Sequence, residues 1–126
     1  MTDIYSAQSA QLADAAERIA PFLVRVDDGT RLSATGVSLG GGYFASASHA
    51  VESDDVAIIT PDGVRHGATL AGRDEATDIA LLKIAADTPV APLFAGTPRV
   101  GELALAVARP KCYNTWRRGW RTSRSG

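Results

Sequence analysis

The sequence has few of the residues that form covalent or metal cross-links, and it has no long hydrophobic segment. Its 126 residues include a single cysteine, Cys112, so no disulfide can form within the chain. Two histidines and one cysteine are too few for a four-ligand zinc site unless carboxylates join them. No apolar run approaches the ~18 residues of a membrane-spanning helix. Residues 1–9 carry neither the basic start nor the apolar stretch of a secretory signal. These absences argue against an integral membrane protein and predict a cytoplasmic location for the chain as written.

What remains is the composition of one globular domain, with 45% hydrophobic and 21% charged residues. The charge is unevenly distributed. All 14 acidic residues lie within 1–108, whereas 109–126 holds six basic residues, no acidic residue and both tryptophans, Trp116 and Trp120. So abrupt a change indicates two segments of different role or origin. We therefore expect three parts: an N-terminal helix over 1–20, a folded domain over 21–108, and a basic tail over 109–126 that is disordered or out of frame.

Hydrophobic periodicity predicts a helix followed by many short strands. Over residues 6–19, apolar side chains recur at helical spacing on one small face, Ser6 or Ser9 can cap the start, and Pro21 limits the end. Beyond Pro21, short runs rich in branched residues alternate with glycine and proline turns, which favours a barrel or sandwich. The predicted strands are Phe22–Val26, Ala34–Leu39, Tyr43–Ala47, Val56–Thr60, Val64–Ala71, Ile79–Ile84 and Leu103–Ala108.

Two side chains capable of acid–base chemistry stand at the ends of predicted strands. His49 follows the small residues that end the strand at 43–47, and Asp78 comes 29 residues later, directly before the apolar run 79–84. A partly desolvated carboxylate needs a hydrogen-bond donor, and an imidazole N–H is a suitable one. Taken singly, His49 could be an ordinary residue at a strand end and Asp78 a turn residue or local cap.

An ordered set of short motifs surrounds both residues. The set comprises Thr35-Gly36, Ser46-Ala47-Ser48-His49-Ala50-Val51, Thr60-Pro61-Asp62-Gly63, Gly72-Arg73-Asp74, Thr77-Asp78-Ile79-Ala80-Leu81-Leu82-Lys83-Ile84 and Arg99-Val100-Gly101-Glu102. From about Pro21 to Pro110, this pattern resembles the first half of a trypsin-like serine protease, most closely the bacterial HtrA (Deg) type. Ser46 stands where that family often has threonine. The resemblance implies a mainly β fold. One six-stranded antiparallel barrel would occupy residues 21–90, with a short helix before it. The strand at 103–108 would open a largely missing second barrel.

The resemblance also implies roles for the two side chains. His49 would be the general base and Asp78 the residue that orients it, acting on a polypeptide substrate with no cofactor. The family's nucleophile lies in a Gly-x-Ser-Gly-Gly setting, and no such string occurs here. Ser123 and Ser125 lie in the basic tail without a glycine-built oxyanion hole. We therefore expect a truncated or frame-shifted serine endopeptidase that lacks its nucleophile and is inactive alone.

A second class of function is a non-catalytic β-barrel that binds peptide. The arginines and tryptophans of the tail could instead bind single-stranded nucleic acid by charge and stacking. An incomplete second barrel would also leave an apolar face uncovered, which predicts self-association. The specificity pocket of the family is not encoded, so the sequence does not indicate substrate preference.

Overall fold

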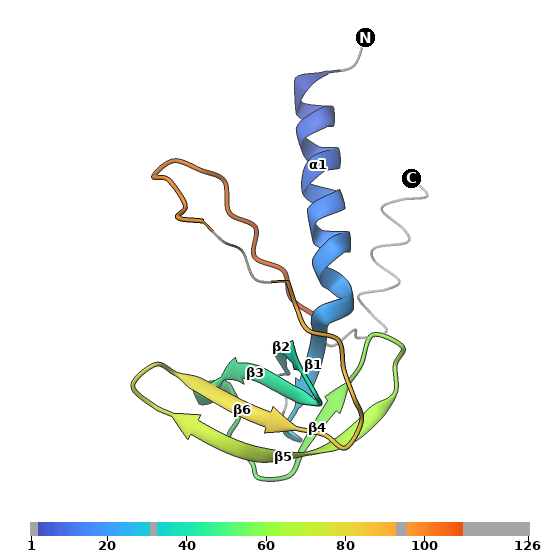
Figure 1. The fold of residues 1–126 in the computed structure, drawn as a ribbon, viewed down its shortest axis with the longest axis vertical. Coiled ribbons are helices and arrows are strands. Elements are labelled where there is room, and N and C mark those ends of the chain that lie inside the picture. Colours follow the sequence, from blue (N-terminus) through green and yellow to red (C-terminus); the bar gives the residue numbers. More distant parts are fainter. Residues whose placement is uncertain (1–2, 31–32, 93–95, 110–126) are drawn as a thin grey trace.

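The computed structural model describes residues 3–30, 33–92 and 96–109, and its body is a closed barrel of six antiparallel strands (Figure 1). The strands are β1 (Leu23–Asp27), β2 (Ala34–Gly40), β3 (Tyr43–Ala47), β4 (Val56–Ile59), β5 (Arg65–Asp74) and β6 (Ile79–Lys83). They close in the order β1-β2-β3-β6-β5-β4. The predicted six-stranded antiparallel barrel within residues 21–90 is confirmed.

The barrel interior is filled by the inward-facing residues of these strands. On β3, for example, Phe44 and Ser46 are buried while Tyr43 is exposed, as the two-residue period of a strand requires. The core cluster consists of Val24, Val26, Phe44, Val51, Val56, Ile58, Ala80, Leu82 and Ile84. Most of these side chains are branched or aromatic, and such residues pack well on a pleated surface. One of them, Val51, comes from the segment that follows β3, so the core also anchors that segment.

Glycines make the tight turn between β2 and β3. Gly40, Gly41 and Gly42 all have positive φ, which glycine adopts without steric penalty. Gly42 is also crowded, because a Cβ built there would lie 2.6 Å from the carbonyl oxygens of both Ile84 and Ala86. The turn therefore depends on glycine both for its backbone conformation and for close packing against the chain that follows β6.

The N-terminal helix α1 (Ile4–Ile19) projects away from the barrel (Figure 1). Its cap is Asp3, whose carboxylate accepts a hydrogen bond of 2.8 Å from the Tyr5 N–H, so the prediction of Ser6 or Ser9 as cap was wrong. The earlier start adds two residues to the helix and places both serines inside it. No residue of α1 is buried. A 3₁₀ turn, η1 (Ala20–Phe22), contains Pro21 and connects the helix to β1.

The segment after the barrel does not form the predicted strand. Residues 102–109 have no regular secondary structure, so the strand expected at 103–108 was wrong. A strand needs an edge to pair with, and the barrel is closed and offers none. Arg109 ties this segment down instead. Its guanidinium donates to the carbonyls of Leu23 and Ala20, both at 2.7 Å, and its backbone N–H donates to Thr35 Oγ1 at 2.9 Å.

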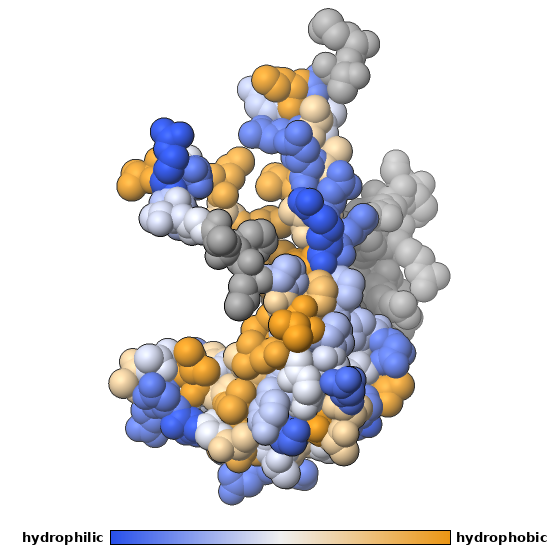
Figure 2. Space-filling model, in the orientation of Figure 1, coloured by the Kyte–Doolittle hydropathy of each residue, from blue (hydrophilic) through white to orange (hydrophobic). Residues whose placement is uncertain are grey.

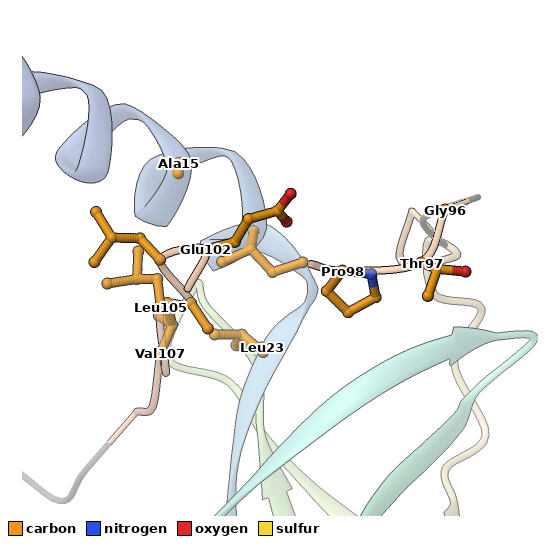
Figure 3. A pocket seen from close by; sticks show the side chains of 11 residues that line it. Ala15, Leu23, Gly96, Thr97, Pro98, Glu102, Leu105 and Val107 are labelled. Atoms are coloured by element: carbon orange, nitrogen blue, oxygen red, sulfur yellow. The ribbon is translucent and has the colours of Figure 1, made fainter. Parts of the chain in front are cut away.

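An apolar hollow of about 770 Å³ lies between α1 and residues 96–107. Hydrophobic side chains gather on the walls that face each other across it (Figure 2). In the close-up, Leu105 and Val107 approach Leu23 beneath Ala15 of the helix (Figure 3).

Within the described ranges, no helix combines the length and apolar character needed to cross a membrane. Beyond Arg109, the basic tail lies outside the described residues, and this part includes Trp116, Trp120, Ser123 and Ser125.

Candidate active site

The pairing of β3 with β6 brings His49 and Asp78 together. These strands are antiparallel, with Ala47 opposite Ile79, so the residue that follows β3 lies beside the residue that precedes β6. His49 belongs to a single 3₁₀ turn, η2 (Ser48–Ala50), that continues from β3. The Ser48 N–H donates a hydrogen bond of 2.9 Å to the Asp78 carbonyl, which extends the strand pairing by one step. The barrel topology itself therefore brings the two predicted site residues together.

The Asp78 carboxylate accepts two hydrogen bonds from His49. The His49 backbone N–H donates to Oδ1 at 2.8 Å, and the ring nitrogen Nδ1 bonds Oδ2. An ionised carboxylate can only accept, so Nδ1 carries the proton. In the neutral imidazole, the other ring nitrogen, Nε2, is then the one with a free lone pair. The pair is thus a base whose tautomer and ring orientation are fixed by the carboxylate.

The electrostatics of the pair favour an ionised aspartate. The hydrogen bond from the His49 ring lowers the pKa of Asp78, and the hydrogen bond from the His49 backbone lowers it further, against a smaller opposing effect of burial. Each bond stabilises the charged form of the carboxyl group. Asp78 therefore keeps its negative charge at neutral pH, where it can stabilise an imidazolium on His49.

Asp78 has an unusual backbone conformation. Its φ is +59°, and it is the one non-glycine residue with positive φ among the residues that the structure describes. Aspartate tolerates this left-handed region better than most side chains, although the conformation still carries strain. The preceding turn is stabilised by Asp74, which accepts hydrogen bonds from the Ala76 N–H at 3.0 Å and the Thr77 hydroxyl at 2.9 Å. Strained backbone of this kind concentrates at functional sites.

The pair is largely open to solvent. The His49 side chain is 76% exposed and that of Asp78 is 45% exposed. In the described part of the chain, no hydroxyl bonds Nε2 of His49, and the two nearest serines in sequence bond elsewhere. Ser46 donates to the Thr35 carbonyl at 2.9 Å, and Ser48 is buried and accepts from Arg73 at 3.2 Å. The exposed nitrogen is therefore accessible to a group brought by another polypeptide segment.

Two residues near the pair were not predicted as site residues. Asp28 is 4% exposed and accepts a 2.9 Å hydrogen bond from the Glu52 N–H, just beyond η2. Burial raises its pKa, but hydrogen bonds from Thr30 and from the Glu52 N–H outweigh that effect and leave it lowered. Arg73, which belongs to the motif Gly72-Arg73-Asp74, donates to carbonyls of the η2 segment. Local sequence signals the turn at Asp28, but nothing in it signals these long-range contacts.

No metal site is evident in the part of the chain that the structure describes: no three His, Cys, Asp or Glu side chains gather there as a metal ion would require. The imidazole and the carboxylate just described can carry out general acid–base chemistry.

Two comparisons with known proteins, one with family models and one with solved structures, find similarity to this chain. The family model described as the trypsin-like peptidase domain matches residues 34–124. The motif resemblance ended near Pro110, so this match continues further, into the basic tail. The solved serine endoprotease from Yersinia pestis is similar in structure, with a TM-score of 0.63 and 31% sequence identity over 71% of this chain. The aligned part is 36% of that protease, so the chain spans about a third of its length. The search among curated proteins gave no match.

Proposed function

Because the chain belongs to the trypsin-like peptidase domain family, we propose that it carries the general-base half of a serine endopeptidase active site. His49 is the base and Asp78 is the residue that orients it. The observation that supports this most directly is the double hydrogen bond from His49 to the Asp78 carboxylate, which in the neutral imidazole leaves the free lone pair on Nε2 of an exposed side chain. A structural histidine at a strand end needs neither feature.

The geometry suits proton transfer in acyl transfer chemistry. Nε2 takes the proton of an attacking serine hydroxyl while the oxygen forms a bond to the peptide carbonyl carbon. The imidazolium that results is stabilised by Asp78, which remains ionised. The imidazolium then returns the proton to the leaving amine as the peptide bond breaks. Water then attacks the acyl carbon with the same proton transfers through Nε2, and the ester bond to the serine breaks. The base and the serine are thereby regenerated.

The nucleophile for this reaction does not come from the residues around His49. Both nearby serines bond other groups, and no Gly-x-Ser-Gly-Gly string occurs in the sequence. We therefore propose that these 126 residues alone do not hydrolyse peptide bonds, and that the serine, the oxyanion hole and the specificity pocket belong to a second polypeptide segment. Removing the nucleophile from a triad leaves no acyl-enzyme route.

A serine-directed fluorophosphonate probe tests this proposal. We expect no covalent labelling of the chain alone, measured by intact-mass spectrometry. Joined to the remainder of the Yersinia pestis protease beyond the aligned part, the chain should become labelled on that partner's serine. His49→Ala should abolish labelling, whereas His66→Ala, which changes the other histidine, on β5, should not. Labelling of the chain alone, or labelling of the joined protein that survives His49→Ala, would show that the proposal is wrong.

A second proposal concerns association between copies of the chain. The hollow between α1 and residues 96–107 is lined mainly by apolar side chains, and Leu103 and Leu105 on its wall are 72% and 47% exposed. Contiguous exposed apolar surface usually marks an interaction site. The chain therefore self-associates through this hollow when nothing else covers it.

A further inference from the structure

We infer that Arg73 is a positioning residue for His49. The inference rests on the proposed role of His49 as the base, and it assigns a function to an arginine on β5. Arg73 lies near the end of β5, and its guanidinium reaches across to the η2 turn. Nη1 donates to the Ser48 carbonyl at 2.9 Å and to the Ser48 hydroxyl at 3.2 Å, and Nη2 donates to the Val51 carbonyl at 2.7 Å.

These contacts hold both ends of the turn that carries the imidazole. The turn has one backbone hydrogen bond of its own, from the Val51 N–H to the Ser48 carbonyl at 3.2 Å. A single 3₁₀ turn is not stable by itself, since its short hydrogen bonds have poor geometry. Arg73 bonds the carbonyl at each end and so fixes the distance between them. His49, which lies between those two residues, is oriented by a backbone that is clamped from outside.

Packing around the imidazole does not fix the position of the ring. The His49 side chain is 76% exposed, so its position depends on its backbone and on Asp78. The neighbours of His49, in contrast, are fixed: Ser48 and Val51 are 3% and 0% exposed. On the far side of the turn, Asp28 accepts the Glu52 N–H at 2.9 Å. The turn is thus fixed by three long-range anchors, from Arg73, Asp28 and the Asp78 carbonyl.

The strand that supplies Arg73 also positions Asp78. In the pairing of β5 with β6, Asp74 lies opposite Ile79 and Arg73 opposite Ala80. The start of β6 directly follows Asp78. It is therefore held in place by its pairing with Arg73 and Asp74 of β5. The end of β5 thus positions the Asp78 carboxylate through its pairing with β6, and it positions the His49 imidazole through the Arg73 side chain.

The chemistry of the contact requires arginine. A guanidinium presents several N–H donors in one rigid plane, so it can bond two carbonyls at once. A lysine in the same place has one ammonium on a flexible stem and cannot hold both ends of the turn at fixed separation. Arg73→Lys should therefore behave much like Arg73→Met at the site.

The test measures the His49–Asp78 contact directly in the full chain. The first readout is the midpoint of the Asp78 carboxyl titration by ¹³C NMR. The second is hydrogen exchange of the His49 amide, which donates to Asp78. Arg73→Met and Arg73→Lys should both raise the midpoint. They should also speed the exchange of the His49 amide by about tenfold or more, because the turn opens locally more often once the guanidinium no longer bonds its two carbonyls. Amides of the buried core residues Ile58 and Leu82 report whether the barrel stays folded.

The matched control is Arg65→Met on the same strand. Arg65 is 60% exposed and pairs with Asp27 at 3.0 Å, so its loss should leave both readouts unchanged. If Arg73→Met does not fold, Arg73→Lys carries the test. Wild-type values for the midpoint and the exchange in a folded Arg73 variant would overturn the inference. Failure of the proposed function would be seen separately, as loss of His49-dependent serine labelling, because neither readout here requires hydrolysis.

Discussion

The low pKa of Asp78 depends mainly on one neighbour, His49, which supplies both of the hydrogen bonds that lower it. In His49→Ala, the ring bond is lost while the backbone N–H of residue 49 still donates. We therefore expect the Asp78 pKa to rise towards the ordinary aspartate value without reaching it. A ¹³C titration of the wild type and the variant measures the change. An unchanged midpoint would mean that the ring does not bond the carboxylate in solution.

The same shift fixes the sign of a pH effect on stability. A carboxyl group whose pKa is lower in the folded chain than in the unfolded chain stabilises the fold when it is ionised. The contribution of Asp78 is therefore fully present above the ordinary aspartate value of about 4. It is lost as the pH falls through the lowered pKa. In His49→Ala, the unfolding midpoint in urea should consequently fall less steeply with acid than in the wild type.

Among the elements, the turn between β2 and β3 shows most clearly how backbone conformation and packing add up. Gly42→Ala places a methyl group 2.6 Å from two carbonyl oxygens at a φ of +84°. Gly63→Ala has nearly the same φ, +87°, but nothing lies within 4 Å of its added carbon. We expect a loss of about 1 kcal/mol for Gly63→Ala and about 2–4 kcal/mol for Gly42→Ala in urea unfolding. Equal losses would show that φ alone matters.

The strands could be predicted because their signals are local. Short branched runs between glycine and proline turns mark β1 to β6, and the order of the motifs around His49 and Asp78 indicated how the barrel closes. The segment at 103–108 has the same alternation, yet it forms no strand, because alternation does not reveal whether a free edge exists. Arg73 and Asp28 were missed for a related reason. Their partners in the segment around η2 lie more than 20 residues away, and only the closed barrel brings them close.

For the molecule as a whole, the barrel is complete and the parts beside it are only lightly attached. The barrel has its own core and no free edge. Helix α1 buries none of its residues, and residues 102–109 are fastened mainly through the three hydrogen bonds of Arg109. The apolar wall between these two parts is therefore exposed on a stable support, which is the arrangement expected of a docking surface.

Self-association through this hollow can be tested with two matched substitutions. Leu105, on its wall, is 47% exposed, and Val64, in the turn before β5, is 48% exposed. Leu105→Asp places a charge where apolar surface would be buried between copies, so it should weaken association by about tenfold or more. Val64→Asp removes a similarly exposed apolar side chain outside the hollow, so it should leave association unchanged. Sedimentation equilibrium across a concentration series measures both. Equal effects of the two substitutions would place the contact elsewhere, and a wild-type chain that stays monomeric throughout would remove the proposal altogether.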